Sequence, residues 1–215
     1  MIRYAPWLLI LLAIGLRAVH FNPVGYSDSG RYLDQAASLR AGQGLYRGSD
    51  PVTNLPPGYP VFIAALRFLY DGESIIYGVQ FFMSVLACWL VYSSIRGRSA
   101  RFALLGLLGM AVHPMLVRWP RAIMSETLGV FLAALAVWLL SRMTCPRQFP
   151  AVLAFFLGLV LLALPLTVPF TVFLAVGVWI AAAIRLRRDV RRLLLLTVPV
   201  PAEKGTSFTV PMGAT

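Results

Sequence analysis

IIYGVQFFMSVLACWLVYSSI, from Ile75 to Ile95, is a continuous and mostly apolar segment without a single charged side chain. A transmembrane helix needs about 20 residues of this kind to cross the hydrocarbon core of a bilayer. The composition of the whole chain agrees, because 59% of its residues are hydrophobic, 13% are charged and the mean hydropathy is +0.78. The sequence therefore predicts an all-α membrane protein rather than a soluble domain.

Further apolar segments lie on both sides of Ile75–Ile95 and are separated by prolines and arginines. We expect about six transmembrane helices in all, the other five covering roughly Tyr4–Val19, Phe102–Val117, Ile123–Leu140, Val152–Leu164 and Phe170–Ile184. The apolar segment Gly58–Tyr70 is too short to span a bilayer, so we expect it to be a re-entrant or interfacial helix. The membrane region is predicted over residues 1–200, with a first external loop at 22–73.

The placement of arginine predicts how the helices are oriented. One set of helix ends carries most of the basic residues, namely Arg3, Arg96, Arg98, Arg101, Arg142, Arg147 and the run from Arg185 to Arg192. The alternate ends carry Arg118 and Arg121. Because cytoplasmic loops are enriched in Lys and Arg, we expect a multi-pass protein with a cytoplasmic N-terminus. Its expected location is the bacterial inner (plasma) membrane. The net charge of +11 is explained in the same way, and no nucleic-acid partner is expected.

This orientation puts two acids, Asp28 and Glu126, on the same non-cytoplasmic side. Asp28 lies in the first loop, where Leu33, Ala36, Ala37 and Leu39 have the spacing of an amphipathic helix that could lie on the bilayer surface. We expect Ser29 to cap this helix and Gly42 or Gly44 to end it. Asp28 would then precede the positive end of the helix, which favours its charged form.

The order of these motifs resembles the N-terminal half of the GT-C membrane glycosyltransferases, and more narrowly their protein-mannosyltransferase and aminoarabinose-transferase branch (glycosyltransferase family 39-like). The resemblance covers roughly residues 1–185. The residues that carry it are Asp28-Ser29-Gly30-Arg31-Tyr32, Gly42-Gln43-Gly44-Leu45, Pro56-Pro57-Gly58-Tyr59-Pro60 and Met124-Ser125-Glu126-Thr127-Leu128.

The resemblance implies transfer of a sugar from a polyprenyl-phosphate donor to a protein, lipid or glycan on the outer face of the membrane. It places Asp28 near the acceptor, as a general base or as an organiser of the site. Some members bind a divalent metal ion near this acid, and many carry a second acid directly beside it. Here the neighbour is Ser29, so a dedicated metal site at Asp28 is in doubt.

Glycosyl transfer by inversion requires residue types that this chain supplies at the expected face. A carboxylate can take the proton of the acceptor and stabilise the cation-like anomeric carbon, which makes Asp28 and Glu126 the catalytic candidates. Arginine can offset the charge of the lipid phosphate, and aromatic rings can stack on a sugar or line the prenyl groove. The candidates for substrate binding are Arg31, Tyr32, Tyr59, His113, Arg118 and Arg121.

Each candidate also has a purely structural interpretation. Asp28 could be a solvated cap residue, and Glu126 could be a first-turn acid stabilised by the helix dipole. Arg118 and Arg121 could anchor the protein to lipid headgroups. His113 could be a structural histidine.

Two other functional classes remain open. The chain could be a non-catalytic subunit or scaffold that binds polyprenyl lipid and needs a protein partner to complete a site. It could also be a small transporter, although no charged residue is expected at the middle of a span. The chain is shorter than complete GT-C proteins, and its only lysine, Lys204, lies in a polar segment at 201–215. We therefore expect a truncated member with a disordered tail.

Overall fold

A computed structural model of the chain describes residues 4–19, 22–47, 50–51, 55–143, 150–182 and 184. The chain divides into two compact units, Met1–Ile180 and Ala181–Thr215. The first unit carries every candidate site residue and is the one described below. The expectations for the arginine run from Arg185 to Arg192 and for the tail at 201–215 lie outside the described residues.

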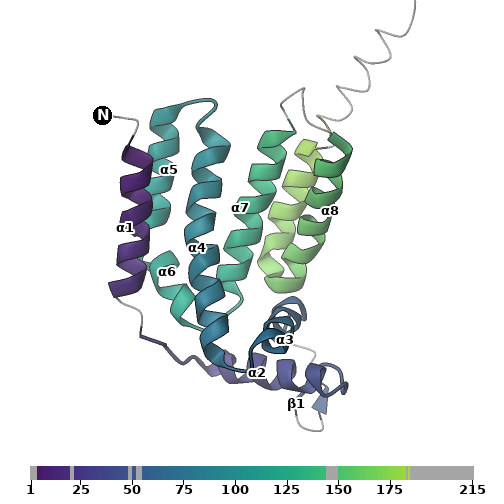
Figure 1. The fold of residues 1–215 in the computed structure, drawn as a ribbon. Helices are drawn as coiled ribbons and strands as arrows, with labels where there is room; N and C mark the ends of the chain where they lie inside the picture. Colours follow the sequence, from purple (N-terminus) through teal and green to yellow (C-terminus); the bar gives the residue numbers. More distant parts are fainter. Residues whose placement is uncertain are drawn as a thin grey trace, which may run out of the picture. The chain divides into compact units, whose positions relative to one another are not determined.

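Most helices of the first unit run side by side. They are α1 (Ala5–Val19), α4 (Glu73–Ile95), α5 (Ala100–Val112), α7 (Glu126–Arg142) and α8 (Pro150–Thr167), followed by η2 (Pro169–Thr171) and a helix over Val172–Ala182. Figure 1 shows α1 and α5 beside α4, and α4 beside α7, which in turn packs against α8. Two short helices, α6 (Pro114–Arg118) and η1 (Trp119–Arg121), connect α5 to α7.

The first loop forms a second layer at one end of these helices. Its helices, α2 (Ser27–Arg40) and α3 (Gly58–Leu69), pack against each other and lie across the lower ends of α4 and α7 in Figure 1. The residues between them include two short antiparallel strands, β1 (Tyr46–Arg47) and β2 (Asp50–Pro51), with Tyr46 opposite Pro51. Gly42, just after α2, has a φ of 73°, which a glycine adopts without strain.

The all-helical fold class is confirmed, but the expected number of long spans is not. Among the described residues, only α4 is long and apolar enough by itself to cross a membrane. α5 and the segment Pro114–Arg121 pass the same test together, although they are bent by 56° at their junction. One or two helices thus meet the criteria of length and composition, not about six. The helices α1 and α7, the segment Val152–Thr167 of α8 and the helix Val172–Ala182 are all shorter than the 18 residues required.

Two prolines act differently from the expectation. The third apolar segment, expected to continue to Val117, breaks at His113–Pro114, because Pro114 has no N–H to continue α5. The fifth helix, expected to end at Leu164, instead continues through Pro165 to Thr167 as α8. There the missing N–H removes a single hydrogen bond close to the helix end, where few further bonds depend on it.

A buried cluster joins the first-loop helices to the rest of the unit. It includes Tyr32 and Tyr59 from α2 and α3, Ile76 from α4, and Ile123 from the segment before α7. α3 also begins against the end of α8, since a Cβ on Gly58 would lie 2.7 Å from the Leu166 carbonyl oxygen. This packing determines where the loop helices present their polar residues.

Candidate functional site

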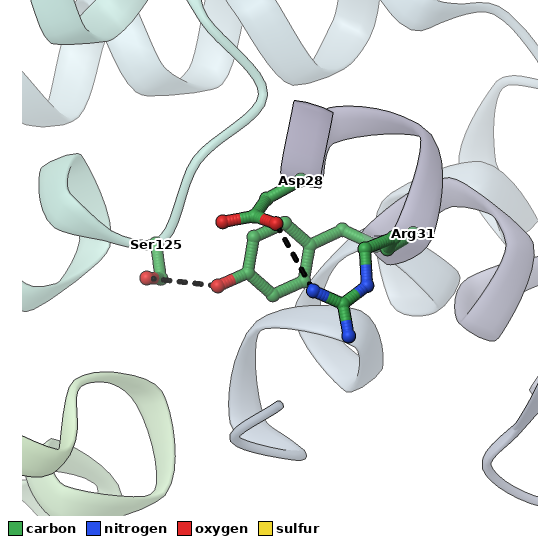
Figure 2. A network of polar contacts seen from close by, with 4 residues as sticks. Asp28, Arg31 and Ser125 are labelled. Atoms are coloured by element: carbon green, nitrogen blue, oxygen red, sulfur yellow. Dashed lines mark hydrogen bonds and ion pairs between the residues drawn. The ribbon is translucent and has the colours of Figure 1, made fainter. Parts of the chain in front are cut away.

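The N-terminus of α2 holds Asp28 and Arg31 together. Helix α2 begins at Ser27, with Tyr26 rather than Ser29 as its N-cap. Ser29 is instead the third residue of the helix, and its hydroxyl accepts a hydrogen bond from the Tyr26 N–H at 3.4 Å. Asp28 is therefore in the first turn of α2. Arg31 binds Asp28 at 3.2 Å, as Figure 2 shows.

Tyr32 connects α2 to the start of α7. Its hydroxyl lies 3.3 Å from the hydroxyl of Ser125, and its ring meets the ring of Tyr59 edge to face at 4.8 Å. The contact with Ser125 is the second dashed line in Figure 2. Burial raises the pKa of the Tyr32 phenol, and the nearby Glu126 and Asp28 add to this effect. Tyr32 is therefore a neutral phenol at physiological pH, and either hydroxyl can donate in its contact with Ser125.

Tyr59 extends the contacts from α3 to α4. It is fully buried and donates a hydrogen bond to Gln80 Oε1 at 3.3 Å. Gln80 in turn donates to two backbone carbonyls of the segment before α7, those of Ala122 at 3.1 Å and Met124 at 3.3 Å. Burial raises the pKa of Tyr59 well above its ordinary value. The Tyr59 hydroxyl, the Gln80 amide and the carbonyls of Ala122 and Met124 thus satisfy one another, as buried polar groups generally do.

Glu126 is the first residue of α7 and follows Ser125 directly. Its carboxylate is half-buried, and it is close enough to Asp28 for the two charges to interact. Its Oε2 atom is buried and has no hydrogen-bond partner. The structure therefore brings together two acids that are far apart in the sequence, and the roles expected for them stay predictions.

The other candidates differ in their relation to these acids. Arg118, at the end of α6, is exposed and lies over the ring of Tyr26 at 5.6 Å, next to the N-terminus of α2. Arg121 is half-buried, and its carbonyl accepts a hydrogen bond from the Val24 N–H at 2.9 Å. His113 is exposed at the junction of α5 and α6, and it takes no part in the described contacts around Asp28.

The described residues hold no group of three or more His, Cys, Asp or Glu side chains that could bind a metal ion. Asp28 and Glu126 offer carboxylate oxygens, which suit a hard divalent cation. Their two carboxylates alone are fewer ligands than a protein cage for such an ion supplies, so water or phosphate would have to complete the coordination.

Sequence reasoning missed three polar residues inside the helices, Arg17, Gln80 and Ser84. Each is buried, and each bonds to a residue of another helix or of the segment between α5 and α7. The available signal was their position within apolar segments, where polar side chains rarely occur without a partner. Gln80 and Ser84 are also one turn apart, on the same face of α4.

No protein-family model, curated protein or solved structure matches this chain. The contacts described above place two carboxylates and several arginines at the end of the helices where α2 meets the start of α7. Such a constellation can hold a phosphate and accept a proton at neighbouring positions.

Proposed function

We propose that the protein transfers a sugar from a polyprenyl-phosphate donor to an acceptor on the non-cytoplasmic face of a membrane. The observation that carries this proposal is the convergence of Asp28 and Glu126 beside the contact between Tyr32 and Ser125. Two acids at one end of apolar helices can act on a substrate whose remainder lies in lipid. The proposal follows the resemblance to the GT-C glycosyltransferases and is independent of which sugar is transferred.

In this proposal Asp28 is the base. It is 40% exposed at its side chain, so an acceptor hydroxyl can reach it, and Arg31 orients its carboxylate. The hydroxyl proton of the acceptor passes to Asp28 while the acceptor oxygen bonds to the anomeric carbon of the sugar. The bond between that carbon and the lipid phosphate breaks, and the phosphate leaves. Glu126 adds negative charge near the cation-like carbon.

The departing lipid phosphate needs positive charge, and arginine is suited to bind it with two parallel hydrogen bonds. Arg118 is exposed and lies beside the N-terminus of α2, so it is the first candidate for this role. Arg121 follows it closely on η1 and is the second.

A multi-pass arrangement belongs to the same proposal. The apolar helices present many large hydrophobic side chains outward, which a soluble surface seldom does. Examples from α1, α4, α5, α8 and the helix Val172–Ala182 are Leu8, Leu11, Phe82, Phe102, Leu105, Leu162 and Phe173. Arginines lie at the ends of α4 and α7 that are away from Asp28. Arg96 and Arg98 follow the last residue of α4, and Arg142 is the last residue of α7. The positive-inside preference would put these ends in the cytoplasm and Asp28 outside.

The test is turnover of polyprenyl-phosphate sugars by the purified chain in lipid bilayers. Wild type, Asp28→Asn and the exposed control Asp71→Asn would be compared, each with and without added Mg²⁺ or Mn²⁺. We expect loss of turnover in Asp28→Asn alone, with donor binding and thermal stability retained. A metal requirement would show as loss of wild-type turnover in chelator.

Two outcomes would contradict the proposal. A folded wild type that binds donor without turnover would favour a scaffold that needs a protein partner. Turnover that is equal in wild type and Asp28→Asn would remove Asp28 from the chemistry. For the transporter alternative, the corresponding test is flux of the lipid-linked sugar across sealed vesicles.

A further inference from the structure

Arg17 is the most deeply buried charge in the described part of the chain. It lies in the last turn of α1, its side chain is 1% exposed, and no described carboxylate contacts it. An unpaired charge in such a place is costly unless all of its donors are bonded. Hydrogen bonds to the surrounding helices must therefore compensate for the burial of this charge.

All five N–H donors of a guanidinium group are accounted for at Arg17. Nε donates to Ser84 Oγ at 2.7 Å, and Nη1 donates to the carbonyl of Ala13 at 3.1 Å. The remaining contacts reach the end of α5 and α4, where Nη1 donates to the Ala111 carbonyl at 3.3 Å and Nη2 to the Met110 carbonyl at 3.2 Å and to Cys88 Sγ at 3.7 Å. A lysine has three donors and cannot reproduce this set.

The carbonyls of Met110 and Ala111 are those that the break at His113–Pro114 leaves without a helical donor. Pro114 would supply the N–H for Met110 in a continuous helix, but proline has none. The last carbonyls of a helix also form its negative end, which favours a cation. Arg17 thus supplies both a positive charge and hydrogen-bond donors to the carbonyls at the break.

The same contacts continue into the segment that leads to α7. Ser84, which binds Arg17, also donates to the Leu116 carbonyl in α6 at 3.4 Å. One turn away on α4, Gln80 holds the carbonyls of Ala122 and Met124. Segment 114–126 is thereby held at both ends by buried side chains, and it carries Arg118, Arg121, Ser125 and Glu126.

We infer that Arg17 is a positioning residue for the candidate site: it fixes the break after α5 and through it the placement of Arg118 and Glu126. This inference rests on the proposed function only for its effect on turnover. The positioning of segment 114–126 is a property of the fold and can be measured without a substrate.

The experiment measures distances between spin labels by double electron–electron resonance, with Cys145 replaced by serine. Cys88 is kept, because it is buried and is one of the partners of Arg17. One pair, Ser74→Cys with Met115→Cys, reports the position of α6 relative to α4. The other, Ser74→Cys with Phe102→Cys, reports the position of α5 on the near side of the break. All three positions are exposed. Each pair is measured with Arg17, Arg17→Gln, Arg17→Lys and, as a matched control on an exposed loop, Arg98→Gln.

We expect Arg17→Gln to broaden the 74–115 distribution and to leave the 74–102 distribution unchanged, with Arg17→Lys intermediate. An unchanged 74–115 distribution in Arg17→Gln would overturn the inference. Equal broadening of both pairs would also overturn it, because Arg17 would then support the whole unit rather than the break.

Turnover supplies the second readout. Misplacement of a catalytic group by about 1 Å can cost about 10²-fold in rate, so we expect Arg17→Gln to lower kcat by about 10- to 100-fold with little change in KM. Arg17→Lys should recover part of this loss, and Arg98→Gln should match wild type. If wild type shows no turnover, the proposed function fails while the distances still decide the role of Arg17.

Discussion

Tyr32 and Ser125 are separated by 93 positions in the chain, yet their hydroxyl oxygens lie 3.3 Å apart. This contact joins the helix that carries Asp28 to the residue that precedes Glu126. A hydrogen bond between two neutral hydroxyls thus links the segments that carry the two candidate acids.

The bond between Tyr32 and Ser125 should be measurable by a double-mutant cycle. Tyr32→Phe and Ser125→Ala each remove one partner, and we expect a coupling free energy of about 0.5–1.5 kcal/mol in unfolding. Unfolding by denaturant in detergent, followed by tryptophan fluorescence, supplies the four free energies. A coupling of zero would mean that the two hydroxyls do not interact.

Gln80 should be essential for stability although it is uncharged. Replacing it by leucine removes the donor to the Ala122 and Met124 carbonyls and the acceptor of the Tyr59 hydroxyl. We expect a loss of at least about 1–3 kcal/mol, the cost of one unsatisfied buried polar group. The control is Gln43→Leu, because Gln43 is exposed after α2 and its replacement should change stability by less than about 0.5 kcal/mol. Equal effects of the two variants in thermal unfolding would contradict this prediction.

Alkaline pH should destabilise the protein through its buried tyrosines. Burial raises the pKa of Tyr32 and Tyr59, so the folded state keeps protons that the unfolded state releases above its ordinary tyrosine pKa of about 10. Their contribution is complete below about pH 10 and is lost as the pH rises further. We expect Tyr59→Phe to reduce the slope of melting temperature against pH above 10.

The matched control for this titration is Tyr70→Phe, since the ring of Tyr70 is exposed at the end of α3. Its slope should equal that of wild type. A slope that is the same in all three proteins would assign the alkaline sensitivity to other groups.

Gly58 should tolerate no side chain. A Cβ there would lie 2.7 Å from the Leu166 carbonyl oxygen and 2.9 Å from Thr167 Cγ2, at the start of α3. Because backbone has to move, we expect Gly58→Ala to destabilise the fold by about 1–3 kcal/mol. Gly78→Ala in α4 meets no atom within 4 Å and should be neutral or stabilising by up to about 1 kcal/mol. A neutral Gly58→Ala would mean that α3 does not rest on the end of α8.

The ion pair between Arg31 and Asp28 should matter more for activity than for stability. Both side chains are partly exposed and belong to one helix, so Arg31→Gln should cost no more than about 0.5 kcal/mol. If Arg31 orients Asp28, the same variant should lower kcat/KM about tenfold or more. Arg40→Gln is the control, because Arg40 also forms an ion pair from α2, with Asp71. Equal activity of the two variants would remove Arg31 from the site.

The sequence alone predicted the helical fold class, the bounds of α4 to within two residues and a helix in the first loop. These features depend on local patterns, since hydrophobicity and helix periodicity act over a few neighbouring residues. The same patterns did not locate the break at Pro114 or the passage of α8 through Pro165. A proline removes a hydrogen bond, but local patterns do not show what replaces it, such as the Arg17 donors at the carbonyls before Pro114.

Only the tertiary structure decided which polar groups meet. Charge counting placed Asp28 and Glu126 on one side, but their proximity requires α2 to lie across the N-terminal end of α7. Arg17 gave no sign in the sequence that it would bond to the end of α5. Such contacts join residues about 90 positions apart, and helix packing, not sequence spacing, brings them together. A pattern with a period of 3.6 residues fixes the face of a helix but not its neighbour.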